Sequence, residues 1–212
     1  MSKQRKPVLT RNLDPTTIAD LDHLDLNSVL IERSALPKQS SSRMHLDSAR
    51  ILDADWSETK VCSLTWLDVE CDHSQLSLVE WPEAHLTRVV MRDSRATGMR
   101  LENAEFQDVR FVGCHLDDAS FTRSKFRRVT FEQCRLRDAD FGGADLEGTV
   151  FLECDLQGVT FIGAKLTGTD IATCSGKDIR IEALDVRGLI VSSQQAAAFA
   201  KLFGLVIRDA RD

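Results

Sequence analysis

The sequence lacks the features that would place the chain in a membrane, in a secretory pathway or on nucleic acid. No run of about 18 apolar residues occurs, so no transmembrane helix is predicted. The opening MSKQRKPVLTRNLDPTT carries charges without an apolar stretch behind them, so no secretory signal is predicted. A net charge of −6 argues against binding a phosphate backbone, which requires a basic surface. We therefore expect a cytoplasmic protein whose partner is another protein.

Sequence patterns of catalysis are also missing. We find no Gly-rich phosphate loop, no nucleophile elbow and no pair of histidines at metal-binding spacing. The five histidines are scattered, and the acid–base arrangement of His115 with Asp117 and Asp118 is a weak signal. We predict a protein that is not an enzyme and that uses no metal and no cofactor.

A five-residue period organises the chain instead. A large apolar residue recurs at nearly every fifth position from Leu46 to Ile171, and after a break at Gly176 the phase continues to Val191. Eight of the ten phenylalanines and all three tryptophans occupy this central position, and the residue two places earlier is small or β-branched. Helices have a period of 3.6 and strands a period of 2, so the chain must turn a corner at each repeat. Such a short repeat predicts a solenoid.

Two further regularities support the solenoid. Eight of the eleven glycines lie two residues after the central position, where their tolerance of positive φ predicts corners. Identical residues also recur at intervals of twenty, as in Cys114, Cys134, Cys154 and Cys174, in Leu116, Leu136 and Leu156, and in Phe121, Phe141 and Phe161. These sets are predicted to be ladders of stacked side chains, about 4.8 Å apart.

The stretch ADFGGADLEGTVFLECDLQGVTFIGAKL, residues 139–166, matches the A(D/N)Lxx pattern, and the chain resembles the pentapeptide repeat family. The resemblance covers residues 44–191 well and residues 20–36 weakly. It implies an all-β fold, a right-handed quadrilateral β-helix in which four repeats make one square coil.

The six cysteines are predicted to be free thiols in a reducing compartment. The four ladder cysteines occupy the buried small position, where cysteine packs as a small hydrophobe. Stacked cysteines point in parallel, which disfavours a disulfide. A zinc site at Cys62, Cys71 and His73 is the alternative, although these residues lack the paired spacing of structural zinc sites.

The ends of the solenoid are predicted to differ from its middle. Residues 1–43 form either irregular first repeats or a short helix from Thr16, and residues 37–43 form a loop or a frayed corner. Residues 44–191 form the β-helix. Residues 192–212 form a short capping helix that starts at Ser193 and stops at Gly204, followed by a short strand at 205–207.

The C-terminal tail resembles that of the Qnr-type topoisomerase-interacting members of the family. This resemblance implies a two-fold homodimer built on the tail. The apolar centre of the interface would comprise Phe199, Leu202, Phe203, Leu205 and Ile207. The alternative is that the same apolar residues only close the last coil.

Outward residues were sorted by the four faces of the predicted coil, which we number in chain order. Face 1 is centred on every twentieth residue from Ile51 to Ile171, and face 3 on every twentieth residue from Val61 to Ile181. Face 1 carries the acids Asp53, Glu70, Asp72, Asp93, Glu132, Glu153 and Asp170, and the bases Arg50, Arg92 and Arg110. Face 3 carries the acids Glu80, Glu83, Glu102, Asp140 and Glu182, and four bases.

An acidic rod resembles a DNA duplex in charge. With the family resemblance, this leads to the first hypothesis: a DNA mimic that binds a type II topoisomerase, DNA gyrase or topoisomerase IV, to inhibit it or to protect it. The second is a scaffold or effector module that binds another protein through an outer face. The outward Val112, Val150 and Leu152 on face 1 favour the second, as does a basic belt at Arg123, Lys125, Arg127, Arg128, Arg135 and Arg137.

Overall fold

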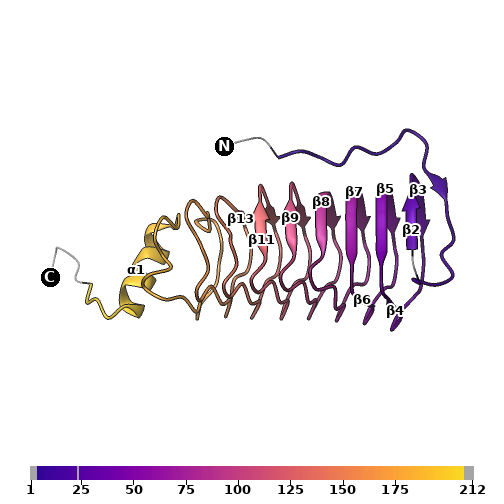
Figure 1. The fold of residues 1–212 in the computed structure, drawn as a ribbon. Coiled ribbons are helices and arrows are strands. Elements are labelled where there is room, and N and C mark those ends of the chain that lie inside the picture. The colour runs from indigo at the N-terminus through magenta and orange to yellow at the C-terminus, as the bar shows by residue number, and fades with distance from the viewer. Residues whose placement is uncertain (1–3, 23, 208–212) are drawn as a thin grey trace.

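The computed structural model describes residues 4–22 and 24–207, and they form the expected right-handed, four-sided β-helix (Figure 1). The coils stack along one axis, with the N-terminal coils at one end and helix α1 at the other. The elements are β1 (Asp14–Pro15), β2 (Leu24–Asn27), β3 (Val29–Glu32), β4 (Ser40–Ser41), β5 (Met44–Leu52), β6 (Lys60–Val61), β7 (Leu64–Asp72), β8 (His85–Arg92), β9 (Glu105–Gln107), β10 (Arg110–Val112), β11 (Lys125–Arg127), β12 (Thr130–Glu132), β13 (Val150–Leu152) and α1 (Ser193–Leu202).

Neighbouring coils pair in parallel with an offset of twenty residues, as the super-period predicts. Phe131 pairs with Phe111 on one side and with Phe151 on the other. The register extends into the first repeats, because Leu26 pairs with Leu46 and Ile31 with Ile51.

The N-terminal repeats are therefore regular, and two alternatives for this region are wrong. No helix starts at Thr16 among residues 16–22. Residues 37–43 are not a loop, because β4 pairs in register with β6. The apolar residues explain this order: Leu21 and Leu36 are buried, so the first coils contribute to the same core as the later ones.

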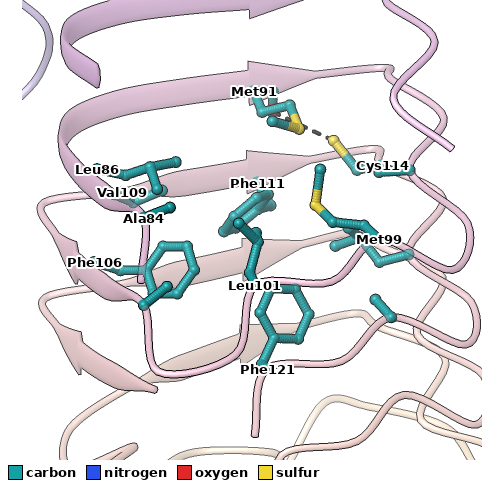
Figure 2. Packing of buried hydrophobic residues seen from close by; sticks show 14 of the residues in the cluster. Ala84, Leu86, Met91, Met99, Leu101, Phe106, Val109, Phe111, Cys114 and Phe121 are labelled. Atoms are coloured by element: carbon teal, nitrogen blue, oxygen red, sulfur yellow. Dashed lines mark hydrogen bonds between the residues drawn. The ribbon is translucent and has the colours of Figure 1, made fainter. Parts of the chain in front are cut away.

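The central residues fill the interior of the solenoid. Phenylalanines one coil apart stack nearly parallel, with ring centroids 4.8 Å apart for Phe111 and Phe131 and 5.0 Å apart for Phe121 and Phe141. Phe161 continues the second ladder at 5.5 Å from Phe141. Figure 2 shows Phe111 and Phe121 inside neighbouring turns of the chain. The predicted phenylalanine ladder is confirmed.

The three tryptophans pack in the N-terminal coils without forming a ladder. The ring centroid of Trp66 lies 6.3 Å from that of Trp56 and 5.4 Å from that of Trp81, and both pairs are tilted. The indole nitrogens of Trp56 and Trp81 donate to the hydroxyls of Ser34 and Thr59. The buried indole nitrogen of Trp66 has no partner within the described chain.

The corners lie where the glycines predict, two residues after the central position. The glycines there have positive φ, but so do many larger residues, such as Leu78 with φ 58° and Asp68 with φ 54°. Backbone bonds between coils hold these residues in place: Leu78 N donates to Thr97 O over 2.9 Å, and Gly98 N donates to Asp117 O over 2.8 Å. Glycine is therefore not required at the corners.

Helix α1 covers the C-terminal end of the core. Its N-cap is Ser192 rather than Ser193, and Gln195 completes a capping box with it. The side-chain nitrogen of Gln195 also donates to the carbonyls of Ile171 and Cys174, over 2.9 and 3.0 Å. These bonds satisfy acceptors at the open edge of the last coils.

Residues 205–207 do not form the predicted strand. A strand requires a neighbour with which to pair, and Leu205 N donates to Ala200 O within the turn that ends α1. Gly204, with φ 81°, follows the C-cap Phe203, as predicted for the end of the helix.

Candidate interaction surfaces

The seven predicted acids on face 1 divide into two groups. Glu70, Asp72, Glu132 and Asp170 flank the central residues of the face and are half-buried. Asp53, Asp93 and Glu153 lie at the corner between faces 1 and 2, with φ values of 54°, 47° and 52°, and are exposed. We call these three residues the corner acids.

Arginines of the same face neutralise most of the first group. Arg50 donates twice to Glu70, over 2.6 and 3.1 Å. Arg92 donates to Asp72 over 3.0 Å. The side chains of Glu70 and Asp72 are only 17% and 18% exposed. The expectation that they point freely into water is therefore wrong, because the arginines lie over them.

Glu132 and Asp170 are also engaged. Arg110 donates to Glu132 over 2.6 Å, and Asp170 accepts a bond from the backbone of Ala172 over 2.9 Å.

The corner acids carry the remaining negative charge of this side of the rod. Glu153 accepts a hydrogen bond from the amide of Gln133 over 3.0 Å. The carboxylates of Asp53 and Asp93 have no hydrogen-bond or ion-pair partner within the described chain. The negative charge of the surface is thus concentrated along one corner instead of covering a face.

The outward apolar residues of face 1 lie beside this corner. Leu152 is 37% exposed, and Val112 and Val150 are half-buried. Leu152 directly precedes Glu153, so an apolar side chain adjoins the last corner acid.

The predicted basic belt is largely neutralised. Arg123 donates to Asn103, Lys125 to Glu105, Arg128 to Asp108, Arg135 to Asp117 and Arg137 to Asp155. Asp117 is 7% exposed, and both the Arg135 side chain and the Arg137 backbone bind it. Because its carboxylate already accepts these bonds, Asp117 is not paired with His115 as an acid–base couple.

The cysteines are arranged for packing. All six are free, and Cys114, Cys134 and Cys154 are buried in one row on face 2, with Cys174 half-buried above them. Cys71 is buried on face 1, where loss of hydration raises its pKa to about 12, whereas Cys62 is exposed on face 3. The structure therefore does not bring Cys62, Cys71 and His73 together. Within residues 4–22 and 24–207, no group of three or more metal-binding side chains has the geometry to hold an ion.

The C-terminal end carries the largest gathering of exposed apolar side chains. Leu202, Leu205 and Ile207 are 57%, 62% and 45% exposed, and Val206, which was not predicted, is 84% exposed. The other two predicted interface residues, Phe199 and Phe203, pack against the chain's own core. The tail thus closes the last coil with one set of residues and exposes another.

Sequence analysis missed a charged ladder at the corner between face 4, whose central residues include Trp66 and Phe126, and face 1. Its members are Asp68, Arg88, Asp108 and Arg128, at intervals of twenty residues. Arg88 binds Asp68 through two bonds of 2.6 Å, and Arg128 binds Asp108 through bonds of 2.6 and 2.7 Å. We call these four residues the corner ladder; the alternation of sign at this spacing was the available signal.

Family models of pentapeptide repeats match much of the chain. A model of a pentapeptide repeat region matches residues 64–141, and a model of eight pentapeptide repeats matches residues 134–171. Together they span more than half of the 212 residues. The chain belongs to the pentapeptide repeat family. No curated protein sequence matches this pentapeptide repeat protein significantly. No helix of the described residues is long and apolar enough to cross a membrane.

Several solved structures are similar to this pentapeptide repeat protein. A trypsin-treated variant of QnrB1, a plasmid-mediated fluoroquinolone resistance protein, is 17% identical, with a TM-score of 0.42 over 92% of this chain and 99% of that one. HetL, a pentapeptide repeat protein involved in heterocyst differentiation regulation from the cyanobacterium Nostoc, is 18% identical, with a TM-score of 0.33 over 91% and 93%. Rfr23 from the cyanobacterium Cyanothece is 16% identical, with a TM-score of 0.33 over 62% and 88%.

Proposed function

We propose that this pentapeptide repeat protein is a non-enzymatic, dimeric interaction protein that binds a basic protein surface through the corner acids. The observation that carries the proposal is the row of Asp53, Asp93 and Glu153, because these carboxylates are exposed and lie on one edge of a rigid rod. Carboxylates on a rigid support attract a basic partner without the entropy cost of ordering a loop. The filled interior places any function on the outer surface.

Dimerisation through the C-terminal end is the first part of the proposal. Leu202, Leu205, Val206 and Ile207 expose apolar surface beside the open end of the solenoid, and a second copy related by two-fold symmetry would bury it. We expect the full chain to have the mass of a dimer in light scattering after gel filtration. Replacing Leu205 and Ile207 with Glu should give a monomer with unchanged circular dichroism. A dimer that persists in this variant would refute the interface.

A type II topoisomerase, DNA gyrase or topoisomerase IV, is the partner that we propose first. The DNA-binding surface of such an enzyme is basic, and the acidic corner follows the axis of a rod, as phosphates follow the axis of a duplex. The tail that resembles Qnr-type members supports the same choice. The proposal predicts that the protein changes DNA supercoiling by the purified enzyme at micromolar concentration, with or without a topoisomerase poison.

Two charge-reversed variants test whether the acidic corner carries this activity. Replacing Asp53, Asp93 and Glu153 with Lys should abolish the effect on supercoiling and on binding. The matched control replaces Glu83, Asp118 and Asp138 with Lys, since these acids are also exposed at corners with positive φ but lie on other edges. The control should retain activity. An inactive parent protein, or two variants that behave alike, would refute mimicry.

A scaffold that binds some other protein is the second candidate, and the ion pairs on face 1 favour it. Arg50, Arg92 and Arg110 neutralise the centre of the face, which a close imitation of DNA would leave negative. The exposed Leu152 beside Glu153 adds an apolar contact that a duplex lacks. Recovery of one non-topoisomerase partner by the parent, and its loss in the corner-acid variant, would favour this candidate.

A further inference from the structure

The N-terminal segment runs back along the outside of the solenoid, over the corner ladder (Figure 1). The backbone N–H of Val8 donates to Asp68 Oδ1 over 2.8 Å, and the backbone N–H of Arg5 donates to Asp108 Oδ1 over 3.0 Å. The side-chain amide of Gln4 donates to the carbonyl of Val109 over 2.6 Å and accepts from Thr130 over 3.3 Å. Residues 4–8 thus contact coils that lie far along the axis from their own.

The spacing of the two carboxylates matches an extended peptide. Asp68 and Asp108 are forty residues apart, which is two coils, or about 9.6 Å at the usual inter-strand distance of about 4.8 Å. Arg5 and Val8 are three residues apart, which is about 10 Å in an extended chain. Every second acceptor along the corner therefore meets every third amide of the segment. This match is a property of any extended backbone.

The ladder is organised to receive amide donors. The side chains of Asp68 and Asp108 are only 8% and 1% exposed, and Arg88 and Arg128 orient each carboxylate through two bonds. In both residues the oxygen that binds the arginine Nε also accepts the backbone N–H. Bonds to a charged acceptor are stronger than bonds between neutral groups.

The segment itself is held mainly by its backbone. Val8 is 68% exposed, Arg5 and Lys6 are exposed, and the core begins only at Ile18. Its removal from the ladder would therefore not open the core. Because two of the contacts use only backbone amides, another extended chain can make the same pair of bonds.

We propose that the corner ladder is a binding site for an extended peptide, and that residues 4–8 occupy it as an internal ligand that a partner's peptide displaces. The partner's segment would need two free amides three residues apart, so its positions corresponding to Arg5 and Val8 would not be proline. This site lies on a different corner from the acids of the proposed function and does not depend on them.

Full-length variants with the internal ligand released test this proposal. Replacing both Arg5 and Val8 with Pro removes the two bonded N–H groups. The control replaces Lys6 and Leu9 with Pro, since neither of these amides has a hydrogen-bond partner within the described chain. The probe is a fluorescent synthetic peptide of residues 1–13, and binding is measured by anisotropy. The released variant should bind the peptide at least about tenfold more tightly than the parent or the control.

The chemistry of the peptide gives a second comparison. A peptide N-methylated at Arg5 and Val8 should lose binding to the released variant, whereas one N-methylated at Lys6 and Leu9 should retain it. Equal binding of both peptides, or equal binding of the unmodified peptide by parent and released variant, would overturn the proposal. So would the absence of measurable binding.

A measurement on the unmodified protein covers the case in which the released variant does not fold. The amides of Arg5 and Val8 should exchange with deuterium at least about tenfold more slowly than those of Lys6 and Leu9. Similar exchange at all four positions would overturn the claim that the segment occupies the ladder.

Discussion

Two regions of the solenoid share one backbone register but differ in how side chains support it. In residues 44–100 the strands β5, β7 and β8 run through the corner between faces 4 and 1, and the core combines tryptophan, leucine, valine and methionine. In residues 101–171 the strands shorten to three residues, and phenylalanine ladders fill the core. The backbone path is therefore compatible with two kinds of core.

One row of small residues shows the same substitution in miniature. On face 2 the buried position holds Ser74 and Ser94 in the first region and Cys114 and Cys134 in the second. Ser94 Oγ donates to the carbonyl of Arg92 over 2.8 Å, and Cys134 Sγ donates to the carbonyl of Glu132 over 3.4 Å. Both use the carbonyl two residues earlier. Oxygen forms the stronger bond, and sulfur contributes more apolar surface.

The largest predicted difference concerns the phenylalanine ladders. Replacing Phe141 with Ala should lower the free energy of unfolding by about 3–5 kcal/mol, because the cavity lies between two stacked rings in a solid core. Phe141→Leu should cost much less. Denaturant titration followed by circular dichroism measures both. Equal losses for Ala and Leu would show that ring stacking, not volume, supports the second region.

The two regions should also differ in thiol reactivity. In the native protein, the exposed Cys62 of the first region should react rapidly with a thiol reagent, whereas Cys71 and the ladder cysteines should be protected by burial and, for Cys71, by its raised pKa. After denaturation without a reductant, six thiols should react. A denatured count of four or fewer would disprove the packing role of the cysteines.

The corner ladder spans both regions and should make them respond to acid together. The hydrogen bond from Arg128 holds the pKa of Asp108 below its ordinary value of 3.8, against the opposing effect of burial, and Arg5 acts in the same direction. Because the folded-state pKa is the lower one, this stabilisation is complete well above pH 3.8 and is lost as the pH falls through the lowered pKa. Asp108→Asn should therefore reduce stability at neutral pH and flatten the loss of stability between about pH 5 and pH 2. An unchanged acid profile would contradict this role.

The corners should respond in opposite directions in the two regions. Gly163 has φ 71°, and a Cβ there would meet only ordinary contacts, so Gly163→Ala should cost about 1 kcal/mol from backbone strain alone. Leu78 already has φ 58° and is 56% exposed, so Leu78→Gly should relieve strain while adding entropy to the unfolded chain. We expect a change of less than about 1 kcal/mol there. A large loss in Leu78→Gly would show that the exposed leucine has a packing role.

The sequence predicted the period, the ladders and the corner positions because each depends on residue type at a fixed spacing. It did not predict the ion pairs on face 1, since whether Arg50 covers Glu70 depends on rotamers across neighbouring coils. It also missed the contact between Val8 and Asp68, because a backbone donor leaves no pattern in side-chain identity. Residues 205–207 were assigned to a strand from their composition, although a strand also requires a partner edge.

The smallest predicted effect lies in the tryptophan-bearing region. Trp66 is fully buried, and its indole N–H has no hydrogen-bond partner in the described chain, in contrast to Trp56 and Trp81. Leaving a buried donor unsatisfied costs about 1–3 kcal/mol, and the smaller ring of phenylalanine loses burial and packing of a similar size. Trp66→Phe should therefore change the free energy of unfolding by less than about 1 kcal/mol, because the two terms oppose each other. Trp81→Phe is the matched control, since it also strands the hydroxyl of Thr59 and should be the more costly of the two. If denaturant titration found both substitutions equally costly, the missing hydrogen bond of Trp66 would be without energetic consequence.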